Sequence, residues 1–284
     1  MVSKKRKKTF VLVIPTFEDF FHSFYAGEII KGVSLAASRL KADILLHLTD
    51  RYDHRGWLDS TLLDLRYVDG IIFADIDNDI NIVKKTIRAG MPCIVLNNML
   101  TEPINCIAVD NKKAASGIVE SLVALGHRKI ATIAGDQTTQ AGVMRLEGYK
   151  EALKKYDINV DKHYVTQGDF LRTPARRAAE KLLSLKDLPT AVFAASDVMA
   201  MELMDVAKSK GIKVPDELSV IGFDDNPLNS SCKVKLTTVA QPLVEMGRLG
   251  LEQLALISHG KARLPVKEML TAKLVKRESV APVA

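Results

Sequence analysis

Two adjacent carboxylates, Asp224 and Asp225, follow an apolar run at 218–223 that is preceded by Pro215. A short apolar run between a proline and the polar sequence Asp-Asp-Asn-Pro predicts a buried strand that leads into a loop. Ligands of open α/β sheets bind just beyond the carboxyl ends of the strands. A carboxylate at such a point accepts hydrogen bonds from hydroxyl groups, which suits a sugar-like ligand. An Asx turn or a helix cap is the structural alternative for Asp224, and we expect Asp225 to be structural.

Arg145 and Phe170 are the next candidates for contact with a small ligand. Arg145 lies near the start of a predicted helix, and its planar guanidinium can bind a ring oxygen, a hydroxyl pair or a carboxylate. A surface arginine paired with Glu147 or Glu151 is the alternative. Phe170 follows a short predicted strand, and its ring could cover the apolar face of a pyranose or stack on a base. A core phenylalanine is equally compatible with the sequence.

Four other positions are weaker candidates for the same ligand. Asn97 ends a predicted strand, and its amide offers both a donor and an acceptor to hydroxyl groups. Ser196 precedes a predicted helix, so it could contact a ligand or serve as the helix N-cap. Phe21 and Tyr25 belong to the aromatic-rich segment 16–25. They could form a wall of a binding pocket, or they could be core or dimer contacts.

The sequence contains none of the common enzyme motifs. The patterns G-x-S-x-G, G-x-x-x-x-G-K-[ST] and G-x-G-x-x-G do not occur, and no set of acid, base and nucleophile stands out. The three cysteines, Cys93, Cys106 and Cys232, are scattered and indicate neither a disulfide framework nor a zinc site. We therefore predict a binding protein with no catalytic residues, no metal site and no cofactor. A hydrolase remains an open alternative.

The elements that must position these residues alternate between strand and helix along the chain. Alternation of this kind predicts parallel sheets covered by helices, and a length of 284 residues favours two Rossmann-like lobes over one core. We predict strands at 10–14, 43–48, 70–73, 92–96, 106–109, 129–133, 164–165, 191–194 and 218–223. We predict helices at 25–40, 58–66, 79–89, 111–125, 141–155, 174–184, 197–210 and 244–258.

Charge is concentrated at the N-terminus. The formal net charge is +6, and the run at 4–8 supplies five of these charges, which leaves the remainder nearly balanced. A balanced body does not favour direct binding of nucleic acid. The basic run could contact DNA phosphates, although a solvated tail is the simpler expectation. No apolar run approaches the roughly 20 residues that span a bilayer, and no secretory signal is evident, so we expect no membrane contact and a cytoplasmic location.

Four motifs occur in order along the chain: L-G-H-R-K-I at 125–130, R-L-E-G-Y at 145–149, V-P-D-E-L-S-V-I-G-F-D-D at 214–225 and L-T-T-V-A-Q-P at 236–242. With these motifs the sequence resembles the LacI/GalR family of sugar repressors. The resemblance implies a type I periplasmic-binding-protein-like fold, with two lobes joined by three crossovers. The implied lobes are 9–110 with 241–270 and 111–240 with 271–284, after a basic tail or linker at 1–8.

The resemblance also implies a function. It identifies the chain as the ligand-sensing and dimerisation core of a transcriptional regulator, in which a small sugar-like effector binds in the interlobe cleft. It places Asp224 and Arg145 at effector-contacting positions and the loop 229–232 at a homodimer contact. Since the first predicted strand begins at Phe10, we expect operator DNA to be bound only through a helix-turn-helix headpiece absent from this chain. A sugar-binding receptor of a transport system, which shares the fold, is the alternative.

Overall fold

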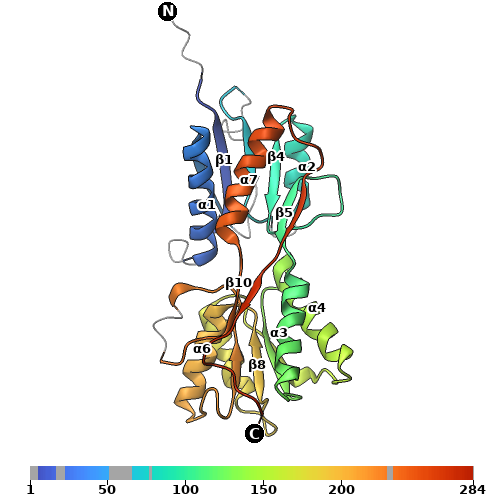
Figure 1. The fold of residues 1–284 in the computed structure, drawn as a ribbon, viewed down its shortest axis with the longest axis vertical. Helices are drawn as coiled ribbons and strands as arrows, with labels where there is room; N and C mark the ends of the chain where they lie inside the picture. Colours follow the sequence, from blue (N-terminus) through green and yellow to red (C-terminus); the bar gives the residue numbers. More distant parts are fainter. Residues whose placement is uncertain (1–5, 17–22, 51–65, 77–78, 229–232, 284) are drawn as a thin grey trace, which may run out of the picture. The chain divides into compact units, whose positions relative to one another are not determined.

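The computed structural model describes residues 6–16, 23–50, 66–76, 79–228 and 233–283. The chain divides into two compact units, both drawn in Figure 1. Unit 1 comprises Met1–Val109 and Pro242–Leu270, and unit 2 comprises Asp110–Gln241 and Thr271–Ala284. The chain therefore passes from one unit to the other at three places.

Unit 1 is built on a six-stranded sheet with the order β11-β5-β4-β3-β1-β2. Its strands are β1 (Thr9–Thr16), β2 (Asp43–Asp50), β3 (Gly70–Phe73), β4 (Cys93–Leu96), β5 (Cys106–Val109) and β11 (Lys267–Leu270). All neighbouring pairs are parallel. Every residue of β3, β4 and β5 is buried, as expected of uninterrupted apolar strands covered on both faces.

Two helices of unit 1 pack with their backbones unusually close together. The helices among the described residues of this unit are α1 (Phe24–Leu40), α2 (Ile80–Arg88) and α7 (Leu243–Ser258). Figure 1 shows α1 and α7 side by side. A Cβ added to Gly32 of α1 would lie 2.0 Å from the Val244 carbonyl oxygen, and one added to Gly247 of α7 would lie 2.4 Å from the Ile29 carbonyl oxygen. Only glycine fits at these two positions, so α1 and α7 form one tightly matched pair.

Part of the basic N-terminal run is held against unit 1. The Arg6 guanidinium donates to both oxygens of Asp69 at 2.9 Å, and Lys8 Nζ lies 2.9 Å from Asp69 Oδ1. The backbone N–H of Thr9 donates to Asp69 Oδ2 at 2.9 Å. Residues 6–8 therefore differ from the free, solvated tail expected from the sequence, while residues 1–5 lie outside the described residues.

Unit 2 contains a four-stranded parallel sheet with the order β7-β6-β8-β9. These strands are β6 (Ile130–Ala134), β7 (Val165–Gln167), β8 (Ala191–Ala194) and β9 (Ser219–Ile221). A separate antiparallel pair consists of β10 (Thr238–Ala240) and β12 (Lys273–Val275). The helices are α3 (Asn111–Ala124), α4 (Gln140–Lys155), α5 (Arg172–Leu182) and α6 (Asp197–Ser209), with the short 3₁₀ turn η4 (Lys162–Tyr164).

The C-terminal segment is fastened to unit 2 by side-chain hydrogen bonds. Ser279 Oγ donates to the Val220 carbonyl at 2.6 Å. His127 Nε2 lies 3.0 Å from the Ala281 carbonyl, and its Nδ1 lies 2.9 Å from Thr190 Oγ1. Nε2 of the His127 ring therefore carries a proton, because a carbonyl oxygen can only accept.

The predicted fold class is confirmed, since two parallel α/β sheets are present. The strands β10, β11 and β12 were not predicted, because they are not uninterrupted apolar runs and lie where the chain passes between units. The predicted helix 58–66 lies outside the described residues. Among the residues that are described, no helix is long and apolar enough to cross a membrane.

Candidate functional site

Asp224 follows β9 in a constrained backbone conformation. Its φ is 131°, and the φ of Asp225 is 63°, both in a region that L-residues rarely adopt. The Asp224 N–H donates to the Val239 carbonyl at 2.8 Å, which holds the loop beside β10. Asp225 Oδ1 accepts a hydrogen bond from Arg277 Nη2 at 2.5 Å. This ion pair agrees with the structural role expected for Asp225.

Arg145 of α4 reaches the Asp224 carboxylate through the interior of unit 2. The arginine is 4% exposed. Its Nε donates to Asn111 Oδ1 at 2.8 Å, and its Nη1 donates to the Ala195 carbonyl at 2.6 Å. Nη1 also lies 3.7 Å from Asp224 Oδ1. Arg145 is therefore not the surface arginine that was the alternative prediction, and its guanidinium is held in one orientation beside the acidic residue.

Two aromatic rings flank the Arg145 guanidinium. Its Cζ lies 3.7 Å from the centroid of the Phe223 ring and 5.6 Å from that of Phe170. A cation this close to a ring face is attracted by the ring quadrupole. Phe170 and the preceding Asp169 have φ values of 62° and 54°, so two consecutive non-glycine residues are left-handed. The loop after β7 thus accepts backbone strain while it presents the Phe170 ring to Arg145.

Gly135, directly after β6, lies against the edge of the Phe170 ring. A Cβ at this position would lie 2.0 Å from Phe170 Cζ and 2.3 Å from its Cε1. No side chain fits there while the ring keeps its place. Glycine at position 135 therefore leaves the space that the Phe170 ring occupies beside the end of β6.

The environment of Asp224 favours its protonated form. Burial raises the pKa of Asp224 to about 7, and the neighbouring charge of Asp197 adds to the rise. The positive charge of Arg145 and the hydrogen bond from Gln241 Nε2 to Asp224 Oδ1, at 2.7 Å, act in the opposite direction. The Asp224 side chain is 20% exposed, so it is accessible to a ligand as well as to its protein partners.

Ser196 adopts the N-cap role that was one of its two predicted uses. Its Oγ accepts a hydrogen bond from Met199 N at 3.3 Å at the start of α6. The next residue, Asp197, is fully buried and accepts hydrogen bonds from Thr238 Oγ1 and the backbone N–H of Asn226. Contact between Ser196 and a ligand stays a prediction.

The remaining predicted site residues belong to unit 1. Asn97 follows β4 with a φ of 65°, and its side chain bonds Asp75, which follows β3. The Tyr25 hydroxyl, on α1, donates to the Ala74 carbonyl. Phe21, with the rest of 17–22, lies outside the described residues, as does the loop 229–232 that was expected at a dimer contact.

Comparisons with known proteins agree on one family. Residues 119–280 match the family described as "Periplasmic binding protein-like domain". The HTH-type transcriptional repressor CytR of Escherichia coli is 34% identical over 253 residues, which cover 87% of this chain and 72% of the repressor. The chain belongs to the LacI family of transcriptional regulators.

Solved structures of LacI-family proteins share the fold of this chain. The structure of a complex of the transcriptional regulator CelR with cellobiose matches with a TM-score of 0.89 and 31% identity, over 97% of this chain and 85% of that one. A LacI-family regulator from Enterococcus faecium with bound ribose matches with a TM-score of 0.84 and 25% identity, over 98% and 100% of the two chains. The periplasmic-binding-protein-like fold implied by the sequence is thus confirmed.

Three residues that complete this LacI-family arrangement were missed as contacts by the sequence argument. Phe223, Asn111 and Gln241 all contact Arg145 or Asp224. Phe223 and Gln241 stand inside motifs that carried the family resemblance, and Asn111 is the first residue of the predicted helix 111–125. Their contacts could not be assigned because the sequence does not tell which apolar or amide side chain turns toward the arginine.

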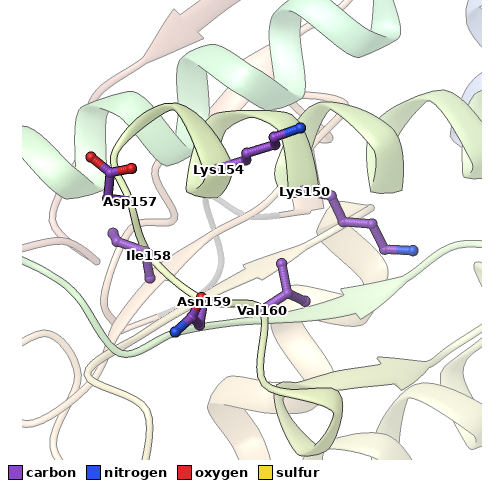
Figure 2. A pocket seen from close by; sticks show the side chains of 6 residues that line it. All are labelled: Lys150, Lys154, Asp157, Ile158, Asn159 and Val160. Atoms are coloured by element: carbon purple, nitrogen blue, oxygen red, sulfur yellow. The ribbon is translucent and has the colours of Figure 1, made fainter.

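A cavity of about 570 Å³ in unit 2 involves a different set of residues. It lies where α4 ends and the chain turns toward η4, and Figure 2 shows the side chains of Lys150 and Lys154 beside it. Its other lining residues are Asp157, Ile158, Asn159 and Val160. This cavity is therefore separate from the cluster around Arg145. Among the described residues, no group of three or more potential metal ligands occurs.

Proposed function

We propose that this LacI-family chain senses a small, sugar-like effector through Asp224, Arg145 and Phe170. The observation that carries the proposal is the 3.7 Å approach of Arg145 Nη1 to Asp224 Oδ1, with aromatic rings on the guanidinium. A carboxylate and a guanidinium fixed side by side offer acceptors and donors to vicinal hydroxyls. The Phe170 ring covers the apolar face of a pyranose or furanose. Binding occurs without turnover, so the chain is not an enzyme.

Relatives with bound sugars support this class of effector. CelR has been solved with cellobiose, and the Enterococcus faecium regulator with ribose. The relatives reported above are transcription regulators, which favours regulation over the transport-receptor alternative. Asn97, Ser196, Phe21 and Tyr25 are additional proposed contacts of the effector.

The output of effector binding is a change in operator affinity. An effector shifts a two-state equilibrium only by its different affinity for the two states. In a homodimer, such a shift alters the spacing of two helix-turn-helix headpieces and hence their fit to operator half-sites. CytR is an HTH-type repressor, and this chain covers 72% of it. We place this chain in the cytoplasm as the effector-binding and dimerisation core.

A thermal-shift screen tests the proposal directly. The panel contains D-glucose, D-galactose, D-ribose, cellobiose, cytidine, adenosine, D-glucuronate and D-glucose 6-phosphate. A ligand that binds only the native state raises the melting temperature, and about 100-fold excess over Kd adds about 2.7 kcal/mol of stability. We expect one panel member to raise the melting temperature of the wild type. We expect no such rise in Asp224→Ala, which size-exclusion chromatography should still show as a dimer. A full rise in this variant would mean that the effector binds elsewhere.

A further inference from the structure

Asp75 holds two asparagine side chains at the carboxyl ends of β3 and β4. Asn97 Nδ2 donates to Asp75 Oδ2 at 3.2 Å. The Asn98 amide is compatible with its neighbours only when its nitrogen is turned toward two acceptors, and in that orientation it donates to Asp75 Oδ1 at 2.9 Å and to the Leu96 carbonyl at 3.2 Å. The Ile76 backbone N–H donates to Asp75 Oδ1 at 2.7 Å. The Asp75 carboxylate is thus held in place by backbone and side-chain donors within unit 1.

This contact determines which end of the Asn97 amide is left for other partners. An ionised carboxylate only accepts hydrogen bonds, so it must face the amide nitrogen and not the amide oxygen. Asn97 is 6% exposed, and its Oδ1 is buried with no donor among the residues described. A buried acceptor without a partner costs about 1–3 kcal/mol, so it persists where another molecule supplies the donor.

We propose that Asp75 is a positioning residue, which fixes the Asn97 amide so that Oδ1 accepts an O–H or N–H from the effector. This inference rests on the proposed function, because it assigns a partner for the same effector. Asp75 does not touch the effector in this proposal. It acts by removing the freedom of Asn97 to turn its nitrogen outward.

The same arrangement occurs within unit 2. Gln241 Nε2 donates to Asp224 Oδ1 at 2.7 Å, and Gln241 Oε1 is buried with no donor among the described residues. In each unit, a carboxylate bonds the amide nitrogen and an amide oxygen is left to accept. The matching groups on the effector are therefore hydroxyl or amino donors. A carboxylate or phosphate oxygen would be repelled there, which favours neutral polyhydroxyl compounds over sugar acids and sugar phosphates.

The first measurement tests the positioning role without any effector. Side-chain amide resonances of ¹⁵N-labelled protein are recorded for the wild type, Asp75→Asn and Asn97→Leu, the last to assign the Asn97 pair. We expect the two Asn97 amide protons to be widely separated in the wild type, because one of them bonds a carboxylate. In Asp75→Asn, which can donate as well as accept, we expect this separation to shrink. Asp79→Asn is the matched control in the same unit, because asparagine replaces aspartate well at the α2 N-cap.

The second measurement tests the effector contact by calorimetric titration with the uncharged members of the panel. We expect Asp75→Asn to weaken binding of the panel member that the wild type binds by about tenfold, as for loss of one well-placed hydrogen bond. Each hydroxyl of that compound is then replaced in turn by fluorine, which cannot donate a hydrogen bond. At one position we expect this replacement to lower the affinity of the wild type about tenfold and that of Asp75→Asn by less. A general structural defect would weaken all analogues equally.

The outcomes separate this inference from the proposed function. Unchanged Asn97 resonances in Asp75→Asn overturn the positioning role. If the wild type and Asp75→Asn bind the sugar with equal affinity, Asn97 Oδ1 accepts a hydrogen bond only from water, and the proposed effector contact is overturned. Binding of D-glucuronate or D-glucose 6-phosphate in preference to the neutral sugars overturns the donor assignment but leaves effector sensing intact. If no panel member binds, the proposed function fails, and with it the claim that Asn97 meets an effector.

Discussion

The guanidinium carbon of Arg145 lies 3.7 Å from the centre of the Phe223 ring, while the same side chain bonds Asn111 and the Ala195 carbonyl. A planar cation is required for this arrangement, because it must lie flat on the ring and still donate along its edges. Lysine carries the same charge, but its ammonium group is not planar and lacks the several N–H donors of a guanidinium.

We therefore expect Arg145→Lys to lose at least about tenfold in effector affinity, although the charge is kept. The variant should also lose about 1–3 kcal/mol of stability, because Asn111 Oδ1 and the Ala195 carbonyl lose a buried donor. Calorimetric titration and urea denaturation measure the two effects. Arg128→Lys is the control, since Arg128 donates to the Val123 and His127 carbonyls at the end of α3. Full affinity in Arg145→Lys would show that the guanidinium plane is not used.

Effector affinity should depend on pH through Asp224. Its pKa is raised to about 7, so a fall in pH below 7 protonates the carboxylate and removes an acceptor for effector hydroxyls. The apparent Kd is the intrinsic value divided by the competent fraction, so it should rise about tenfold between pH 8 and pH 6. Titrations across this range test the effect. Asp224→Asn should bind weakly with little pH dependence, and the same tenfold change in this variant would contradict the assignment.

The same group should leave a signature in stability. The pKa of Asp224 in the folded protein lies above the unfolded value of about 3.9. The contribution of Asp224 to the free energy of unfolding is therefore fully present below about pH 4. It is lost as the pH rises through about 7. Asp224→Asn does not titrate, so it should gain stability relative to the wild type between pH 5 and pH 8. Urea midpoints at these two pH values measure the gain, and a loss over this interval would mean that the pKa is not raised.

Gly135→Ala should impair the effector site through Phe170. The added Cβ would lie 2.0 Å from Phe170 Cζ, so the ring must move. We expect a loss of about three- to tenfold in effector affinity, since an aromatic contact contributes about 0.5–1.5 kcal/mol. In a Phe170→Ala background, Gly135→Ala should have little further effect on binding. Gly117→Ala is the matched control in α3, because a Cβ there meets nothing within 4 Å. Additive losses in the double variant would exclude action through the ring.

His127 should make the wild type less stable in mild acid. Burial lowers the pKa of His127, and the hydrogen bond to the Ala281 carbonyl opposes this only in part. The contribution of His127 to the free energy of unfolding is therefore complete above the unfolded pKa of about 6.5. It declines as the pH falls toward the folded pKa, by at most about 1.4 kcal/mol per pH unit. Urea midpoints at pH 7.5 and 5.5 should fall less in His127→Gln than in the wild type. His163→Gln, whose side chain is 58% exposed, should match the wild type.

Much of the fold follows from sequence pattern, because buried parallel strands are uninterrupted apolar runs. The runs at 70–73, 106–109 and 191–194 correspond to β3, β5 and β8 with identical bounds. The short strands β10, β11 and β12 carry no such pattern, since only tertiary contacts select them. Their existence depends on where the chain returns to each sheet, which local sequence does not encode.

The placement of the candidate residues at strand ends was predictable, but their contacts with one another were not. Placing Asp224 and Asn97 at strand ends required only the rule for open sheets. The roles of Gly135 and Asp75 required coordinates, because a steric limit of 2.0 Å and the orientation of one amide depend on residues far apart in sequence. Ser196 shows the opposite case, since its preference for helix N-caps anticipated the bond that the structure contains.

The close packing of α1 and α7 at Gly32 and Gly247 has a consequence for the order in which the two units are completed during synthesis. Helix α7 and strand β11 are synthesised after every residue of 110–241, yet they belong to unit 1. When a ribosome has completed residue 241, the larger segment of unit 2 has been made, whereas α1 still lacks α7, the helix whose backbone packs against Gly32. Unit 1 therefore cannot be completed until residues 242–270 have been synthesised, and the incomplete unit exposes apolar surface during that interval.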